Sequence, residues 1–200
     1  MATSLWETGP RVGDTSPEYL KWRALMDKLP PLDRIRRNLL PSPGEKPPVY
    51  HYGFPFTRKY ALNYARRHHL TVPLAVKDRD KMGGRPVLDF ADLDDALLES
   101  DRAVRMFAAT MCISLMIDDL SRKCDFPFDM ARPFSDAWDG MVSLWSNYDV
   151  ERKLHWCEEP SEFKKIIEIL TAAMNETDDH KSLKAQWWFD WDNESGPEQP

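Results

Sequence analysis

The chain has 200 residues, of which 42% are hydrophobic and 30% charged, and it carries a net charge of −6 and three cysteines. This composition excludes a disordered or fibrous protein, and the length allows a sizeable core without disulfides or metals. The apolar stretch at 106–117 is too short to span a bilayer. The first ten residues lack the features of a secretory signal, and no C-x-x-C pair occurs, so we expect a cytoplasmic protein.

Proline residues divide the chain into an N-terminal arm, a linker and a main body. Ser16-Pro17-Glu18 is typical of a helix start, and Pro30-Pro31 stops that helix near residue 29. A second, short helix is expected at 32–40. We therefore predict a helical arm at 1–40, a Pro-rich linker at 41–48, a main helical domain at 49–192 and a frayed tail at 193–200.

The first part of the main body mixes extended and helical signals. Aromatic residues alternate at 49–56, which indicates a short extended segment, and Thr57 caps a helix that continues to about residue 70. Short β-like runs at 71–76 and 86–90 fit one short β-hairpin at about 71–90.

The remaining segments indicate helices. The strongest pattern predicts a buried central helix at about 103–123, and further helices are expected at 133–146, 150–157, 162–175 and 181–189. The predicted fold class is therefore mainly α, a helical bundle-like single domain with at most the one short hairpin.

The first candidate site is the pair Asp118 and Asp119 near the end of the central helix. Both carboxylates flank its apolar face, close to the negative end of the helix dipole, where they repel each other unless solvent, basic partners or a cation compensates. Local pairing with Arg122 and Lys123 is the simpler interpretation.

Residues 113–123 (ISLMIDDLSRK) resemble locally the paired-aspartate motif of class I terpene synthases. That resemblance implies Asp118 and Asp119 as ligands of Mg²⁺ and a substrate diphosphate. The chain departs from the family pattern, since the next acid is Asp125, residues 147–151 have the wrong spacing for the second metal motif, and the chain is too short for that fold. We expect no metal or cofactor, with Mg²⁺ at these two residues as the secondary possibility.

Tyr60, Tyr64 and His68 form a second candidate site, spaced four residues apart on one helix. Tyrosine and histidine can transfer protons, so the row could line a pocket together with the aspartates. The alternative, which we favour, is the half-buried face of an amphipathic helix.

Charge is unevenly distributed, because residues 51–85 contain eight Lys and Arg and only two acids. Internal pairing with the acidic remainder explains this better than nucleic-acid binding, and no nucleic-acid module is recognisable. The histidines and cysteines show no zinc-ligand spacing, and no nucleophile or P-loop motif occurs.

Two short segments favour a protein partner. Pro47, Pro48 and Tyr50 match P-P-x-Y, a ligand pattern for WW domains. Trp187, Trp188 and Trp191 form a dense aromatic cluster near the C-terminal end, and such residues are enriched in interface hot spots. In both cases the side chains could instead pack on their own domain.

The functional expectation is a non-catalytic binding or interaction protein that uses aromatic-rich surfaces. The first alternative is a protein or enzyme that binds a small apolar or diphosphate-bearing molecule in an inter-helical pocket near Asp118 and Asp119. The second alternative is a nucleic-acid binder that uses the basic segment. The sequence does not specify an oligomeric state.

Overall fold

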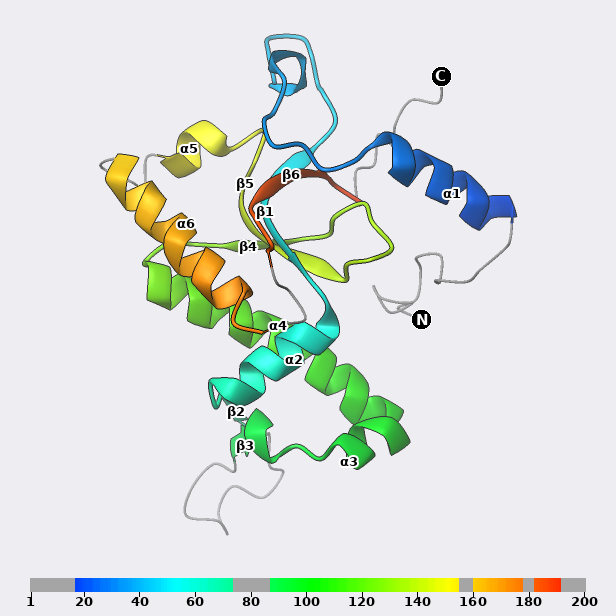
Figure 1. The fold of residues 1–200 in the computed structure, drawn as a ribbon, viewed down its shortest axis with the longest axis vertical. Coiled ribbons are helices and arrows are strands. Elements are labelled where there is room, and N and C mark those ends of the chain that lie inside the picture. Colours follow the sequence, from blue (N-terminus) through cyan, green and yellow to red (C-terminus); the bar gives the residue numbers. More distant parts are fainter. Residues whose placement is uncertain (1–16, 74–86, 155–159, 178–181, 192–200) are drawn as a thin grey trace. The chain divides into compact units, whose positions relative to one another are not determined.

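The computed structural model describes residues 17–73, 87–154, 160–177 and 182–191 (Figure 1). The chain forms two compact units. Residues 1–57 and 124–200 belong to the first, here called the sheet unit, and residues 58–123 form the second, here called the inserted unit.

The sheet unit is built on a four-stranded antiparallel sheet with the order β4-β5-β1-β6. Its elements in chain order are α1 (Pro17–Lys28), the 3-10 helix η1 (Arg37–Leu39), β1 (Tyr50–Phe56), β4 (Asp129–Ala131), β5 (Gly140–Ser146), α5 (Val150–Leu154), α6 (Pro160–Met174) and β6 (Gln186–Phe189). The part of the arm that follows α1, residues 29–40, extends the sheet at the free edge of β6. Leu32 and Trp187 exchange two backbone hydrogen bonds there.

The two central strands, β1 and β5, form the core of the sheet unit. Phe54, Phe56 and Leu144 are completely buried. A bulge shifts the register between Tyr52 and Gly53. Gly53 is required there, since a Cβ at this position would lie 2.0 Å from the carbonyl oxygen of Val142.

The prediction of a mainly α, bundle-like fold is wrong, because the sheet uses two segments that were expected to be helical. The segment predicted as a helix at 133–146 contains β5, and the segment predicted at 181–189 contains β6. Residues 140–145 of β5 are all buried, so this central strand shows no alternation and cannot be distinguished from a buried helix by periodicity. In β6 the burial alternates, as a strand requires.

The inserted unit is mostly helical. It comprises α2 (Arg58–Arg67), β2 (Thr71–Pro73), β3 (Val87–Asp89), the 3-10 helix η2 (Phe90–Asp92), α3 (Asp95–Ser100) and most of α4 (Arg102–Cys124). Strands β2 and β3 pair antiparallel, which confirms the hairpin, although its connecting loop lies outside the described residues. The long helix expected at 103–123 is present as α4, and Asp101 caps its N-terminus by accepting hydrogen bonds from two backbone N–H groups.

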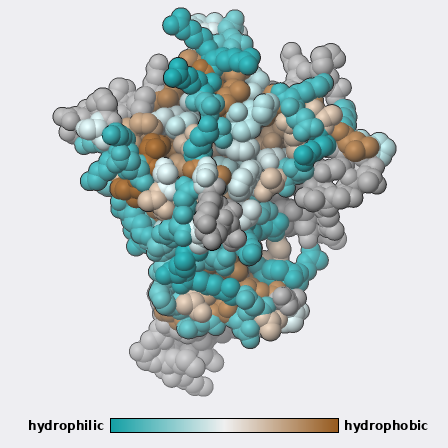
Figure 2. All heavy atoms as spheres, in the orientation of Figure 1, coloured by the Kyte–Doolittle hydropathy of each residue, from teal (hydrophilic) through white to brown (hydrophobic). Residues whose placement is uncertain are grey.

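Most apolar side chains are inside. On the face shown in Figure 2, hydrophobic residues form small patches between hydrophilic ones. The large hydrophobic residues recorded as exposed lie far apart in the chain, at Leu20, Val87, Phe107, Met130 and Tyr148. Of the described helices, none is long and apolar enough to cross a membrane.

Candidate functional site

The inserted unit brings three of the residues singled out from the sequence together. The Tyr64 hydroxyl on α2 donates a hydrogen bond to Asp119 Oδ2 on α4 over 2.8 Å. Lys123 Nζ lies 2.8 Å from the same oxygen and 2.9 Å from the Tyr64 hydroxyl oxygen, and it lies 3.3 Å from Nδ1 of His68. The local pairing expected from the sequence is confirmed for Asp119, which forms ion pairs with Arg122 and Lys123. The additional contacts of Lys123 with Tyr64 and His68 on α2 were not predicted from the sequence.

The other two residues of that set are Asp118 and Tyr60, and the Tyr60 ring packs beside that of Tyr64, with ring centres 6.3 Å apart. Asp118 is exposed on α4, and the Tyr60 ring is buried with the Arg67 guanidinium 5.7 Å from its centre. Burial raises the pKa of Asp119, but hydrogen bonds from Lys123 and Tyr64 and the charges of Lys123 and Arg122 outweigh it and hold the pKa below its usual value. The carboxylate is thus charged and locally compensated, an arrangement that ties α2 to α4.

The tryptophan cluster is built into the sheet unit. Trp187 is buried, and its ring lies 5.3 Å from that of Tyr52. Trp191 packs against Phe134 at 5.2 Å and carries the Arg132 guanidinium 4.4 Å above its ring. Trp188 is half-buried, and its indole N–H has no acceptor among the described residues. Much of this aromatic surface is therefore occupied by the protein's own chain.

The P-P-x-Y segment also contacts its own unit. The carbonyl oxygens of Pro47 and Pro48 accept hydrogen bonds from Tyr148 Oη and Asn147 Nδ2 respectively. Tyr50 begins β1 and is 6% exposed. A WW-type partner would therefore have to remove Tyr50 from the sheet.

A serine, a histidine and an aspartate lie in a row on one face of the sheet. His51 Nδ1 is 3.1 Å from Ser143 Oγ, and His51 Nε2 is 3.5 Å from Asp190 Oδ2. Ser143 is completely buried in β5, so a substrate cannot reach its hydroxyl. The row is best understood as polar cross-strand packing.

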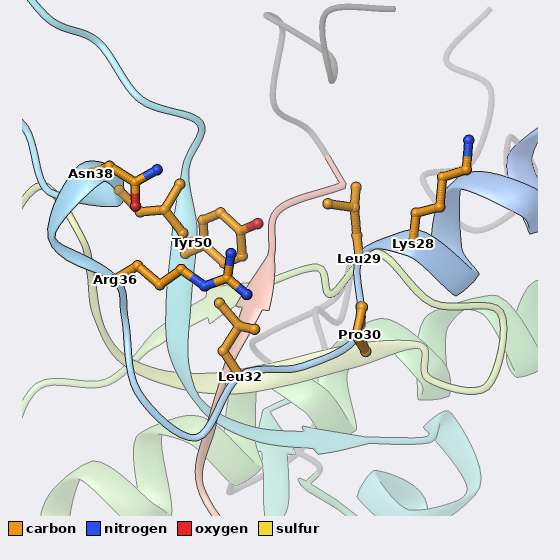
Figure 3. Close-up of a pocket in the computed structure, with 8 residues that line it drawn as sticks. Lys28, Leu29, Pro30, Leu32, Arg36, Asn38 and Tyr50 are labelled. Atoms are coloured by element: carbon orange, nitrogen blue, oxygen red, sulfur yellow. The ribbon is translucent and has the colours of Figure 1, made fainter. Parts of the chain in front are cut away.

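A cavity with a volume of about 250 Å³ lies between the arm and the start of β1 (Figure 3). Its walls are mainly apolar, and it is lined by Lys28, Leu29, Pro30, Leu32, Arg36, Asn38, Leu39 and Tyr50. In Figure 3 the guanidinium of Arg36 and the hydroxyl of Tyr50 point toward the same space, whereas the Lys28 side chain points away from them. We call this cavity the arm pocket.

The polar groups of the arm pocket are unpaired within the part of the chain that the structure describes. No acid forms an ion pair with Arg36, and the Tyr50 hydroxyl has no hydrogen-bond partner there. Burial raises the pKa of Tyr50, and the charge of Arg36 opposes that rise only in part. The buried phenol of Tyr50 and the exposed guanidinium of Arg36 thus both line an apolar recess, where each can donate hydrogen bonds to an acceptor.

Backbone contacts fix the walls of the arm pocket. Asn147 is 2% exposed, accepts a hydrogen bond from the backbone N–H of Tyr50 and donates one to the carbonyl of Leu39. Leu32 is held by its pairing with Trp187. Of the pocket residues, only Tyr50 has a pattern in the sequence that marks it, because the others come near it only after the arm folds onto the sheet edge.

Among the described residues, no group of three or more His, Cys, Asp or Glu side chains could hold a metal ion. Comparison of the chain with protein-family models, with curated proteins and with solved structures finds no match.

Proposed function

We propose that this protein binds a small, largely apolar molecule carrying an acidic group, and that it does so in the arm pocket. The observation that carries the proposal is that two donors without a partner among the described residues, the Arg36 guanidinium and the Tyr50 hydroxyl, point toward one apolar recess. Ligand sites commonly combine apolar walls with a few placed polar groups in this way. The small-molecule site that we propose therefore lies in the sheet unit and not near Asp118 and Asp119, where the sequence had suggested it.

The volume limits the size of the ligand. Pockets for drug-sized molecules measure roughly 300–1,000 Å³. At about 250 Å³ the arm pocket suits a smaller body, such as a short alkyl chain or a single ring.

An interaction surface made of the C-terminal tryptophans has less support. Trp187 is 7% exposed and forms part of the sheet. Trp191 already packs on Phe134 and Arg132.

Binding of octanoate tests the proposal. Methyl ¹H–¹³C spectra should show octanoate-dependent shifts at Leu29, Leu32 and Leu39, which line the pocket, and none at Leu144 in the sheet core. Isothermal titration should give saturable binding that Leu39→Trp abolishes by filling the recess. If the three pocket leucines do not shift at saturating octanoate, octyl phosphate and octanol alike, the proposal is wrong.

A further inference from the structure

We infer that the acidic group of the ligand is a single carboxylate, held by the forked guanidinium of Arg36 and by the hydroxyl of Tyr50. This inference rests on the proposed function and specifies its ligand class. It requires that the polar end of the arm pocket match one planar anion with one negative charge better than it matches a phosphate.

The charge at the pocket centre fits a monoanion. Arg36 contributes one positive charge, and Lys28 points away from the shared space of Arg36 and Tyr50 (Figure 3). A phosphate carries up to two negative charges, of which Arg36 can pair with one.

Three lining residues already use their backbone N–H groups within the protein. The backbone N–H of Leu32 binds the Trp187 carbonyl, that of Leu39 binds the Arg36 carbonyl, and that of Tyr50 binds the Asn147 side chain. Pro30 has no N–H group. These lining residues therefore do not form the nest of N–H groups that phosphate sites commonly use.

The two side-chain donors suit a carboxylate. A guanidinium can give two parallel hydrogen bonds to the two oxygens of a carboxylate. Tyr50 keeps its proton at neutral pH, as an ordinary tyrosine does, and burial raises its pKa further, so its hydroxyl can donate one more hydrogen bond. The leucines and Pro30 remain to contact an alkyl or aromatic body.

The test compares the affinities of octanoate, octyl phosphate and octanol for the full chain. Octanoate should bind most tightly. Arg36→Gln should weaken octanoate binding about tenfold to a hundredfold, the range expected for losing a charged hydrogen bond. Arg36→Lys should lower the octanoate affinity by an intermediate factor, because lysine keeps the positive charge but cannot form two parallel hydrogen bonds. Tyr50→Phe should lower the octanoate affinity about threefold to tenfold.

Arg37→Gln is the matched control, since Arg37 is the next residue along the chain, is exposed as Arg36 is, and does not line the pocket. It should leave the octanoate affinity unchanged, and octanol binding should be insensitive to Arg36→Gln. If Arg36→Gln and Arg37→Gln lower the octanoate affinity equally, the inference is wrong.

The outcomes separate the inference from the proposed function. If octyl phosphate or octanol binds as tightly as octanoate and shifts the pocket leucines, the pocket binds ligands but the carboxylate inference is wrong. If none of the three compounds shifts those leucines, the proposed function itself is wrong.

Discussion

The side-chain amide of Asn147 donates a hydrogen bond to the backbone carbonyl of Leu39 over 2.6 Å, which joins the turn after β5 to the arm. The same amide donates to Pro48 and accepts from the backbone of Tyr50. One buried residue thus fixes two walls of the arm pocket, although it does not line the pocket itself. It is a positioning residue in the sense that it acts through Leu39 and Tyr50.

Asn147→Ala should lower the free energy of unfolding by about 2–4 kcal/mol, because it leaves the buried N–H group of Tyr50 and the partly buried carbonyls of Leu39 and Pro48 without their side-chain partner. It should also weaken octanoate binding. Urea unfolding and isothermal titration measure the two effects.

Asn175→Ala is the control for Asn147→Ala. Its amide likewise joins two segments, α6 and the backbone of Leu183, but it lies outside the pocket lining. This variant should lose stability while keeping its octanoate affinity. If both variants lose affinity equally, Asn147 acts on the fold in general and not on the pocket.

Two glycine substitutions should destabilise the protein for different reasons. Gly53→Ala should lower the free energy of unfolding by about 3 kcal/mol or more, because its Cβ collides with the backbone of Val142 in a central strand. Gly44→Ala should lower the free energy of unfolding by only about 1 kcal/mol. A Cβ there meets open space, so the only source of strain is the backbone φ of +87°. Urea unfolding of both variants checks the order, and a milder effect at Gly53 would show that the β1–β5 pairing adapts.

The fall in the free energy of unfolding at low pH should depend on Asp119. Its folded-state pKa lies below the unfolded value of about 3.9, so its stabilising contribution is present above that pH and is lost as the pH falls through the folded-state pKa. Asp119→Asn should therefore cost about 1–2 kcal/mol at pH 7 and make stability fall less steeply below about pH 4.

Asp118→Asn provides the comparison for Asp119→Asn, because Asp118 is exposed on the same turn of α4. It should change the free energy of unfolding at pH 7 by no more than about 0.5 kcal/mol. Chemical unfolding from pH 2 to pH 8 measures both variants, and a wild-type acid slope in Asp119→Asn would refute the role assigned to this carboxylate.

Local sequence signals predict the helices better than the sheet. The N-terminal limit of α1 follows from Ser16-Pro17, and the long apolar pattern gives α4 nearly to its ends. Strand β5 was not predictable in this way, because a strand buried on both faces has no period of two. Its identity as a strand depends on β1 and β4, which lie far away in the sequence and pair with it on either side.

The same limit applies to the candidate sites. Tyr64 and Asp119 were each singled out from the sequence, but their hydrogen bond joins residues 55 positions apart, which no local pattern specifies. No pattern in the sequence marks Arg36 as a binding residue, since an arginine beside another arginine is common on protein surfaces. Arg36 becomes a candidate only because the structure places it near the Tyr50 hydroxyl, which has no partner among the described residues.

Two tyrosine-to-phenylalanine substitutions test the difference between a paired and an unpaired hydroxyl. Tyr64→Phe should lower the free energy of unfolding by about 1–2 kcal/mol, because it removes a buried hydrogen bond to a charged group, Asp119. Tyr50→Phe should change it by less than about 0.5 kcal/mol without ligand, since the Tyr50 hydroxyl has no partner among the described residues. Saturating octanoate should stabilise wild type more than Tyr50→Phe, because a ligand bound only to the native state raises stability according to its affinity. Thermal unfolding with and without octanoate measures both effects, and a large loss from Tyr50→Phe in the absence of ligand would show that the hydroxyl serves the fold instead of the pocket.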